Sequence, residues 1–189
     1  MTTTDALTDS LARTLRTARE AQGLSVSALA DASGVSRAMI GKVERGEAQP
    51  TAVLLGRLSA ALGLTLSELL ARAEGGTGRL ARAADQPVWQ DPETGYTRRN
   101  VSPMTTGAIQ LVDVTLPAGA RVAYPAEAYT FAHRQVWVLE GTLVFDEGDV
   151  RHLLAAGDCL ELGAPAPCTF RNESGEPARY VVAVARRHG

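Results

Sequence analysis

Apolar residues in the first third of the chain recur at the three- and four-residue spacing of amphipathic helices. Capping residues and glycines divide this stretch into five predicted helices. Their expected limits are Ser10–Gln22, Ser25–Gly34, Ser36–Gly46, Pro50–Leu62 and Thr65–Arg72. Pro50 is placed in the first turn of the fourth helix, where its missing N–H costs nothing. Thr65 and Glu68 have the spacing of a capping box for the fifth.

Beyond Pro87 the apolar positions alternate with polar ones over short runs, which predicts strands. The candidate strands are Ile109–Leu116, Gln135–Leu139, Thr142–Phe145, Cys159–Leu162 and Tyr180–Ala185. Many short strands separated by turn residues favour an antiparallel barrel or sandwich. Residues 73–87 hold three glycines without sustained periodicity and are predicted to be a linker. The expected fold is therefore α + β in two domains, with helices over 11–72 and a β-barrel over 88–187.

The segment 26–45 has the pattern of two short helices that cross at a fixed angle. Ala30 is small where such helices pack closest, and Gly34 is placed at the turn, where a positive φ is expected. The positions expected to point inward are apolar: Leu29, Val35, Ile40 and Val43. Ser36 is placed to cap the second helix with its hydroxyl. The exposed face of that helix would carry residues suited to a DNA groove and its phosphates: Arg37, Ala38, Gly41, Lys42 and Arg45.

Charge is unevenly distributed in a way that supports this interpretation. The formal net charge of −2 divides into eight basic and five acidic residues over 11–72, giving +3, and 11 basic and 16 acidic residues elsewhere, giving −5. Positive charge is thus enriched where the motif lies, which favours attraction to phosphate.

Composition and targeting signals point to an ordinary globular protein in the cytoplasm. The chain is 45% hydrophobic and 21% charged, as is usual for globular domains. No apolar run approaches the roughly 20 residues of a membrane span, so no membrane partner is expected. The N-terminal sequence lacks the basic and apolar regions of a signal peptide. The two cysteines show no zinc-ligand spacing.

Two resemblances cover nearly the whole chain. Residues 13–70 resemble the phage-repressor (XRE-type) helix-turn-helix domain, with GVSRAMIGKVERGEAQPT close to its core pattern. Residues 89–184 resemble a cupin, a small jelly-roll barrel, through the stretches LPAG, VWVLEGTLVF, AAGDCLEL and APCTFRNES. The whole is similar to bacterial regulators that join these two domains. That resemblance implies a homodimer that binds operator DNA and whose cupin senses a small-molecule effector.

The helix-turn-helix resemblance also implies roles for six side chains. Those implied at base edges are Arg37, Ala38 and Lys42, and those implied at phosphates are Arg13, Ser36 and Arg45. Val26 stands where members of this group often have Gln, so that phosphate contact is not carried over. Glu44 is expected to be structural, because phosphate repels a carboxylate.

The cupin resemblance predicts neither metal nor enzymatic activity. Metal-binding cupins place two His, a Glu and a third His inside the barrel. The Glu position here is Arg134, and the last His position is Cys168. The two remaining positions are Glu127 and Tyr129, or alternatively Ala128 and Thr130. None is a histidine, and a cation in the Glu position opposes a divalent metal.

The same positions suggest a pocket for an anion instead. Arg134, with Tyr129 and with Arg98 or Arg99 nearby, could clamp a carboxylate or oxyanion through paired hydrogen bonds. The alternative is a structural ion pair between Arg134 and Glu127. Cys168 either lines the pocket or acts as a redox-sensing thiol, or it is a small buried apolar residue, which is the commoner case.

The resulting hypothesis is a dimeric regulator of transcription. The first alternative is a cupin enzyme that carries an accessory DNA-binding module. The second is an antitoxin-like repressor whose C-terminal domain binds a partner protein.

Overall fold

The computed structural model describes residues 3–74, 79–103, 109–130 and 132–186. The five predicted helices are all present, as α1 (Thr3–Ala21), α2 (Val26–Ser33), α3 (Arg37–Glu44), α4 (Ala52–Ala61) and α5 (Leu66–Glu74). Helix α1 begins at Thr3 rather than at Ser10, because no glycine or proline interrupts the residues between them. Helix α5 continues into the first two residues of the predicted linker, whose residues 75–78 lie outside the described part.

Side-chain caps explain where these helices begin. The Ser25 hydroxyl accepts a hydrogen bond from the Ala28 N–H at 3.0 Å. The Thr65 hydroxyl and the Glu68 carboxylate each accept from the other residue's N–H, at 3.0 and 2.8 Å, which confirms the capping box. The sequence analysis predicts Pro50 in the first turn of α4, but Pro50 lies before this helix. The cap is Thr51, whose hydroxyl accepts from the Leu54 N–H, so α4 begins at Ala52, two residues after the predicted start.

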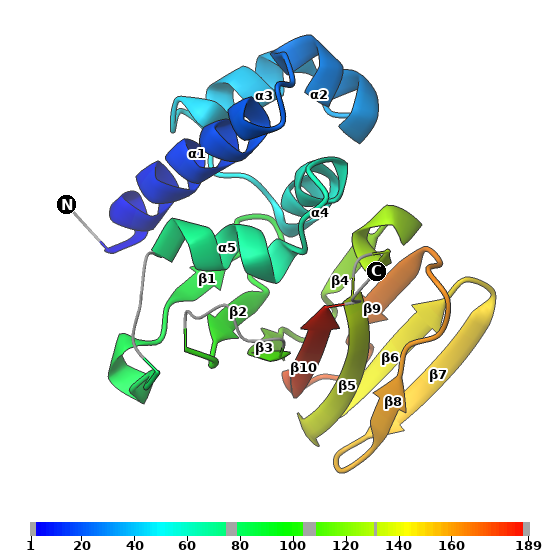
Figure 1. Cartoon of the computed structure of the whole chain (residues 1–189). Coiled ribbons are helices and arrows are strands. Elements are labelled where there is room, and N and C mark those ends of the chain that lie inside the picture. Colours follow the sequence, from blue (N-terminus) through cyan, green and yellow to red (C-terminus); the bar gives the residue numbers. More distant parts are fainter. Residues whose placement is uncertain (1–2, 75–78, 104–108, 131, 187–189) are drawn as a thin grey trace.

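The C-terminal part consists of two antiparallel sheets (Figure 1). Its strands are β1 (Val88–Gln90), β2 (Thr97–Asn100), β3 (Ile109–Leu116), β4 (Arg121–Tyr124), β5 (Ala132–Glu140), β6 (Thr142–Glu147), β7 (Val150–Ala155), β8 (Cys159–Glu161), β9 (Cys168–Arg171) and β10 (Ala178–Arg186). The six-stranded sheet has the order β1-β2-β3-β10-β5-β8, and the four-stranded sheet β4-β9-β6-β7. From β3 to β10 the chain passes from one sheet to the other at each connection except the β6–β7 hairpin, as in a jelly roll, which confirms the predicted fold class.

Aromatic side chains fill the space between the two sheets. Phe170 of β9 stacks on Tyr180 of β10 with ring centroids 5.6 Å apart, and this pair joins the sheets. Phe145 of β6 packs against Phe170 at 4.7 Å. The rings are buried because inward and outward residues alternate along each strand.

The helical domain and the barrel share one continuous apolar core. Figure 1 shows α4 and α5 lying between the other helices and the strands. Helix α4 packs on β4 and on the short helix η2 (Ala126–Tyr129). Gly56 of α4 lies directly against Tyr124 of β4, because a Cβ on Gly56 would be only 2.8 Å from the Tyr124 Cδ1.

A buried carboxylate also joins the two domains. Asp91, which follows β1, is 3% exposed. Its Oδ1 accepts a hydrogen bond from the Ala52 N–H at 2.8 Å, at the start of α4. Its Oδ2 accepts from the N–H and the hydroxyl of Thr94, at 2.9 and 2.6 Å. The negative charge therefore lies at the positive end of the α4 dipole, which stabilises the helix and its position on the barrel.

The contact at Gly56 predicts that alanine lowers the thermal stability at Gly56 but raises it at Gly41, a second helical glycine. Alanine favours a helix interior over glycine by about 1 kcal/mol. In Gly56→Ala the new methyl meets the buried Tyr124 ring, and such overpacking costs about 1–3 kcal/mol, so the thermal midpoint should fall by a few degrees. In Gly41→Ala the methyl meets only the tip of the Arg45 side chain at 3.0 Å, and the midpoint should rise.

Differential scanning calorimetry of both variants measures these shifts. Equal stabilisation by the two substitutions would contradict the tight junction between α4 and the barrel.

Candidate functional site

Helices α2 and α3 are held at their crossing by buried apolar side chains. Leu29 and Ile40 are completely buried, and Val43 is 2% exposed. The turn between the helices has Gly34 at φ 67°, a conformation that strains residues with a Cβ. The Gly34 N–H donates to the Ala30 carbonyl oxygen at 2.9 Å and closes α2. The inward positions predicted from the sequence are thus confirmed.

The opposite face of α3 is exposed and positively charged. Arg37, Ala38 and Lys42 are exposed along this face. Within the described part of the chain, neither Arg37 nor Lys42 belongs to an ion pair. The Ser36 hydroxyl caps the helix by accepting from the Met39 N–H at 3.2 Å. This leaves two cations outside ion pairs among the described residues, one at the start of α3 and one in its last turn, where an anionic partner could reach them.

Arg45 differs from these two cations because it has an acidic partner. Its Nε and Nη2 donate to Oε1 and Oε2 of Glu47 at 2.7 and 2.8 Å. These hydrogen bonds raise the pKa of the Arg45 guanidinium and lower the pKa of the Glu47 carboxyl. The guanidinium lies over Gly41, so a contact with phosphate would compete with Glu47.

Arg13 lies on α1 and not on α3, where most of the residues predicted to contact DNA are. It is exposed and lines a surface groove with Arg72 of α5. No residue of α3 is among the described residues that line this groove. A phosphate contact by Arg13 would therefore be made from α1, beside α5.

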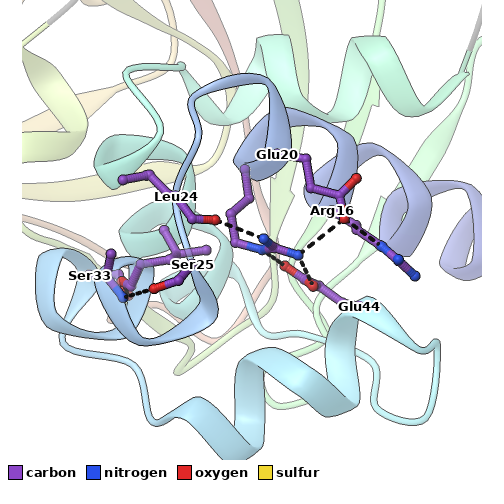
Figure 2. Close-up of polar contacts among 9 residues, drawn as sticks. Arg16, Glu20, Leu24, Ser25, Ser33 and Glu44 are labelled. Atoms are coloured by element: carbon purple, nitrogen blue, oxygen red, sulfur yellow. Dashed lines mark hydrogen bonds and ion pairs between the residues drawn. The ribbon is translucent and has the colours of Figure 1, made fainter.

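Glu44 is structural, as predicted, and its partner is distant in the sequence. Arg19 Nε and Nη2 donate to Glu44 Oε1 and Oε2 at 2.7 and 2.9 Å, and Arg19 Nη1 donates to the Leu24 carbonyl oxygen at 2.8 Å (Figure 2). The Arg19 and Glu44 side chains are only 10% and 7% exposed. The bonded Glu44 carboxylate raises the pKa of the Arg19 guanidinium. This pair joins α1, the turn before α2 and the end of α3.

The second candidate site is a cavity of about 50 Å³ at the junction of the barrel and the helical domain. Two arginines and four tyrosines supply its polar lining: Arg98, Arg134, Tyr96, Tyr124, Tyr129 and Tyr180. Gly56, Leu66 and Ser67 form the wall contributed by α4 and α5. The predicted pocket residues Arg98, Tyr129 and Arg134 are thus brought together.

Arg134 is largely buried in this cavity. Its Nη2 donates to the Ala128 carbonyl oxygen at 2.7 Å, and its guanidinium lies 4.6 Å from the centre of the Tyr129 ring, a cation–π contact. Its Nη1 is buried without a hydrogen-bond partner. Burial lowers the pKa of the Arg134 guanidinium. The predicted alternative, an ion pair between Arg134 and Glu127, is absent, because Glu127 is exposed and does not line the cavity.

Two further predicted pocket residues lie elsewhere. Arg99 is exposed, because successive residues of β2 point to opposite sides and Arg98 points inward. Cys168 is buried behind the cavity and does not line it. Burial raises the pKa of the Cys168 thiol to about 12, so the reactive thiolate needed by a redox sensor is suppressed.

No group of three or more His, Cys, Asp or Glu side chains in the described part of the chain is arranged to hold a metal ion. Nor is any described helix both long and apolar enough to cross a membrane.

Comparison with known proteins bears on the helical part. The helix-turn-helix family model matches residues 15–69. These residues are a helix-turn-helix domain. Over 67 residues, 35% of this chain, it is 37% identical to the HTH-type transcriptional regulator SutR of Escherichia coli (strain K12). The match spans 38% of that protein's length. The resemblance to XRE-type regulators is confirmed for this domain.

Solved structures extend the comparison to the complete fold. An HTH_3 family transcriptional regulator from Vibrio cholerae is similar with a TM-score of 0.79 and 23% identity, over 98% of this chain and 100% of that one. The cupin_2 domain of an XRE family regulator from Enterobacter cloacae matches 49% of this chain and 98% of that one, with a TM-score of 0.44 and 15% identity. The first of these shows that a helix-turn-helix domain and a barrel are combined elsewhere in the same arrangement.

Sequence reasoning missed the residues through which the helix-turn-helix domain reaches the barrel. Gly56, Ser67 and Asp91 belong to segments that read as ordinary helix or turn. The Asp91–Thr94 spacing is that of an Asx turn and predicts the local bend. It carries no information on the distant Ala52 N–H, whose approach depends on the packing of α4.

The buried Arg19–Glu44 pair predicts that removing Glu44 destabilises the protein strongly, whereas removing the exposed Glu20 hardly changes its stability. Glu44→Ala removes the buried partner of Arg19 and leaves this cation only the exposed Glu20 carboxylate, at 3.5 Å, and the Leu24 carbonyl oxygen, which should lower the free energy of unfolding by about 3 kcal/mol. Glu20→Ala removes a partner that is 52% exposed, so the free energy of unfolding should hardly change. Urea titrations followed by circular dichroism measure both. A Glu44→Ala protein as stable as the wild type would show that this pair does not hold α3 in place.

Proposed function

We propose that this protein is a transcriptional regulator that recognises operator DNA with helix α3. The observation that carries the proposal is the exposed face of α3 on a helix-turn-helix scaffold, where Arg37 and Lys42 belong to no ion pair with any described residue. In such domains the second helix enters the major groove with its N-terminal residues at base edges. Arg37, the first residue of α3, is then the residue placed to read a guanine through its O6 and N7.

We further propose that the protein is a homodimer formed through the outer face of the six-stranded sheet. Ile109, Leu111 and Trp137 are 64%, 38% and 50% exposed on this face. Val181 and Ala183 of β10 lie between them, opposite Trp137 and Leu111 in the strand register. The exposed apolar surface is therefore continuous across three strands, which is typical of interaction sites. A second copy fits it best, because helix-turn-helix domains read two half-sites as dimers.

The cavity between the barrel and the helices is the proposed site of a small-molecule effector. It is supported by its position, because it is lined by both the barrel and the DNA-binding domain. A ligand that binds there has different contacts in different arrangements of the two domains, which is the requirement for control of one site by another.

DNA recognition predicts a specific loss for Arg37→Ala. Sheared genomic DNA retained by the wild-type protein at near-physiological salt should contain a few regions that share an inverted repeat. Arg37→Ala should lose its preference at one base position of each half-site, by about 1–3 kcal/mol. The matched control is Arg57→Ala, which removes an equally exposed arginine from α4 of the same domain and should retain the preference.

Binding-site selection followed by sequencing compares the three proteins. Unchanged base preference in Arg37→Ala would exclude the proposed role of this side chain. Diffuse retention of DNA by the wild type would contradict the regulator itself.

The proposed dimer predicts a change in mass for Trp137→Glu. A carboxylate in the centre of a paired apolar face has no partner and must be desolvated, so the variant should sediment as a monomer. The control is Leu153→Glu, which adds the same charge at a residue 73% exposed on β7 of the other sheet. Analytical ultracentrifugation should show a dimer for the wild type and for the control. A dimeric Trp137→Glu protein would place the interface elsewhere.

A further inference from the structure

We propose that the cavity at the domain junction binds a compact oxyanion that holds the DNA-binding domain against the barrel. This inference rests on the proposed function only in one respect, namely that the bound anion would influence DNA binding. The binding site itself follows from the charges of the cavity, its unsatisfied Arg134 Nη1 and its volume.

The first observation is an excess of positive charge without a counter-ion. Arg98 and Arg134 both line the cavity, and neither belongs to an ion pair in the part of the chain that the structure describes. Burial lowers the pKa of the Arg134 guanidinium, and the neighbouring Arg98 cation adds to the lowering. The described residues that line the cavity include no Asp or Glu. Two partly buried guanidinium groups that line one cavity are costly unless an anion joins them.

The second observation is that a donor in the cavity lacks an acceptor. Arg134 Nη1 is buried without a hydrogen-bond partner. Buried polar atoms in native proteins are nearly always satisfied, so this nitrogen indicates a missing acceptor. An oxyanion supplies several acceptor oxygens to guanidinium and phenol donors at once.

The volume of the cavity limits the size of the ion. A water molecule needs about 10–15 Å³ of such space, so the 50 Å³ present would hold only a few waters. This suits a tetrahedral oxyanion or a carboxylate of a few carbon atoms. A nucleotide, a sugar or a long acyl chain would need more space than this.

The third observation is that the DNA-binding domain completes the site. Arg98 Nη2 donates to the Ser67 hydroxyl of α5 at 2.6 Å, so this cation is positioned from the helical side. Gly56 and Leu66 close the same wall. An anion held between Arg98 and Arg134 therefore binds the docked arrangement better than an undocked one. By linkage it must stabilise the docking of α4 and α5.

Four anions test this site on the full-length protein: sulfate, phosphate, acetate and malonate, each against chloride at constant ionic strength. Isothermal titration calorimetry measures binding, and hydrogen exchange measures the protection of residues 52–74. At least one anion should bind the wild type and slow the exchange of these amides at least threefold. Arg134→Gln and Arg98→Gln should each weaken that binding at least tenfold.

The matched control is Arg99→Gln, the adjacent arginine on the outer side of β2, which should bind as the wild type does. Arg134→Lys keeps the positive charge but loses the paired N–H donors of the guanidinium, so its anion affinity should lie between those of the wild type and Arg134→Gln. If Arg134→Gln does not fold, the anion affinity of Arg98→Gln and the hydrogen-exchange pattern of the wild type still test the proposal. Binding equal in all variants, protection spread over the whole chain, or no binding of the four anions would overturn the proposal.

The same preparations separate this inference from the proposed function. DNA retention is measured in chloride buffer without the test anions. Selective retention by a protein that binds none of them overturns the anion site and leaves the regulator standing. An anion response that requires Arg134, in a protein without DNA selectivity, overturns the regulator and leaves the anion site.

Discussion

The packing of α4 and α5 against the barrel is the constraint on which the rest of this structure depends. Interfaces between domains of one chain are often polar and permit relative motion. Here the apolar core runs through the junction without a break, and the absence of a Cβ at Gly56 brings α4 against the Tyr124 ring. The Asp91 carboxylate adds a directional contact, because it caps α4 from the barrel side. The orientation of the DNA-binding domain is therefore tied to the barrel.

Two arginine–glutamate pairs in the helix-turn-helix domain illustrate how burial decides the role of a charge. Arg19 and Glu44 are nearly inaccessible and satisfy each other, so they hold α3 against α1 and are unavailable to DNA. Arg45 and Glu47 have similar geometry, but their side chains are 59% and 52% exposed. Water screens that pair, so Arg45 can exchange its carboxylate for a phosphate at small cost.

The cavity arginines are a third case, in which burial is not matched by an acidic partner. Arg98 reaches the Ser67 hydroxyl, and Arg134 reaches the Ala128 carbonyl oxygen and the Tyr129 ring. These neutral contacts disperse the positive charge without cancelling it. The same side chains form the boundary between the domains, so the proposed anion site and the docking of the helices depend on one set of residues.

The sequence by itself determined the features that depend on neighbours along the chain. The five helices, most of their caps, the turn at Gly34 and the long central strands follow from local periodicity and from the conformations open to Ser, Thr and Gly. The strands β1, β2, β4, β7 and β9 were not predicted. Four of these have only three or four residues and give little periodic signal, whereas β7 has six residues, as many as the predicted β6. The alternation of side chains along β2 predicts that only one of Arg98 and Arg99 points inward, but it does not predict which of the two does. Only the tertiary structure decided that Glu44 meets Arg19, that Asp91 caps α4 and that Ser67 reaches Arg98, because each contact joins residues at least 25 positions apart whose approach is set by packing.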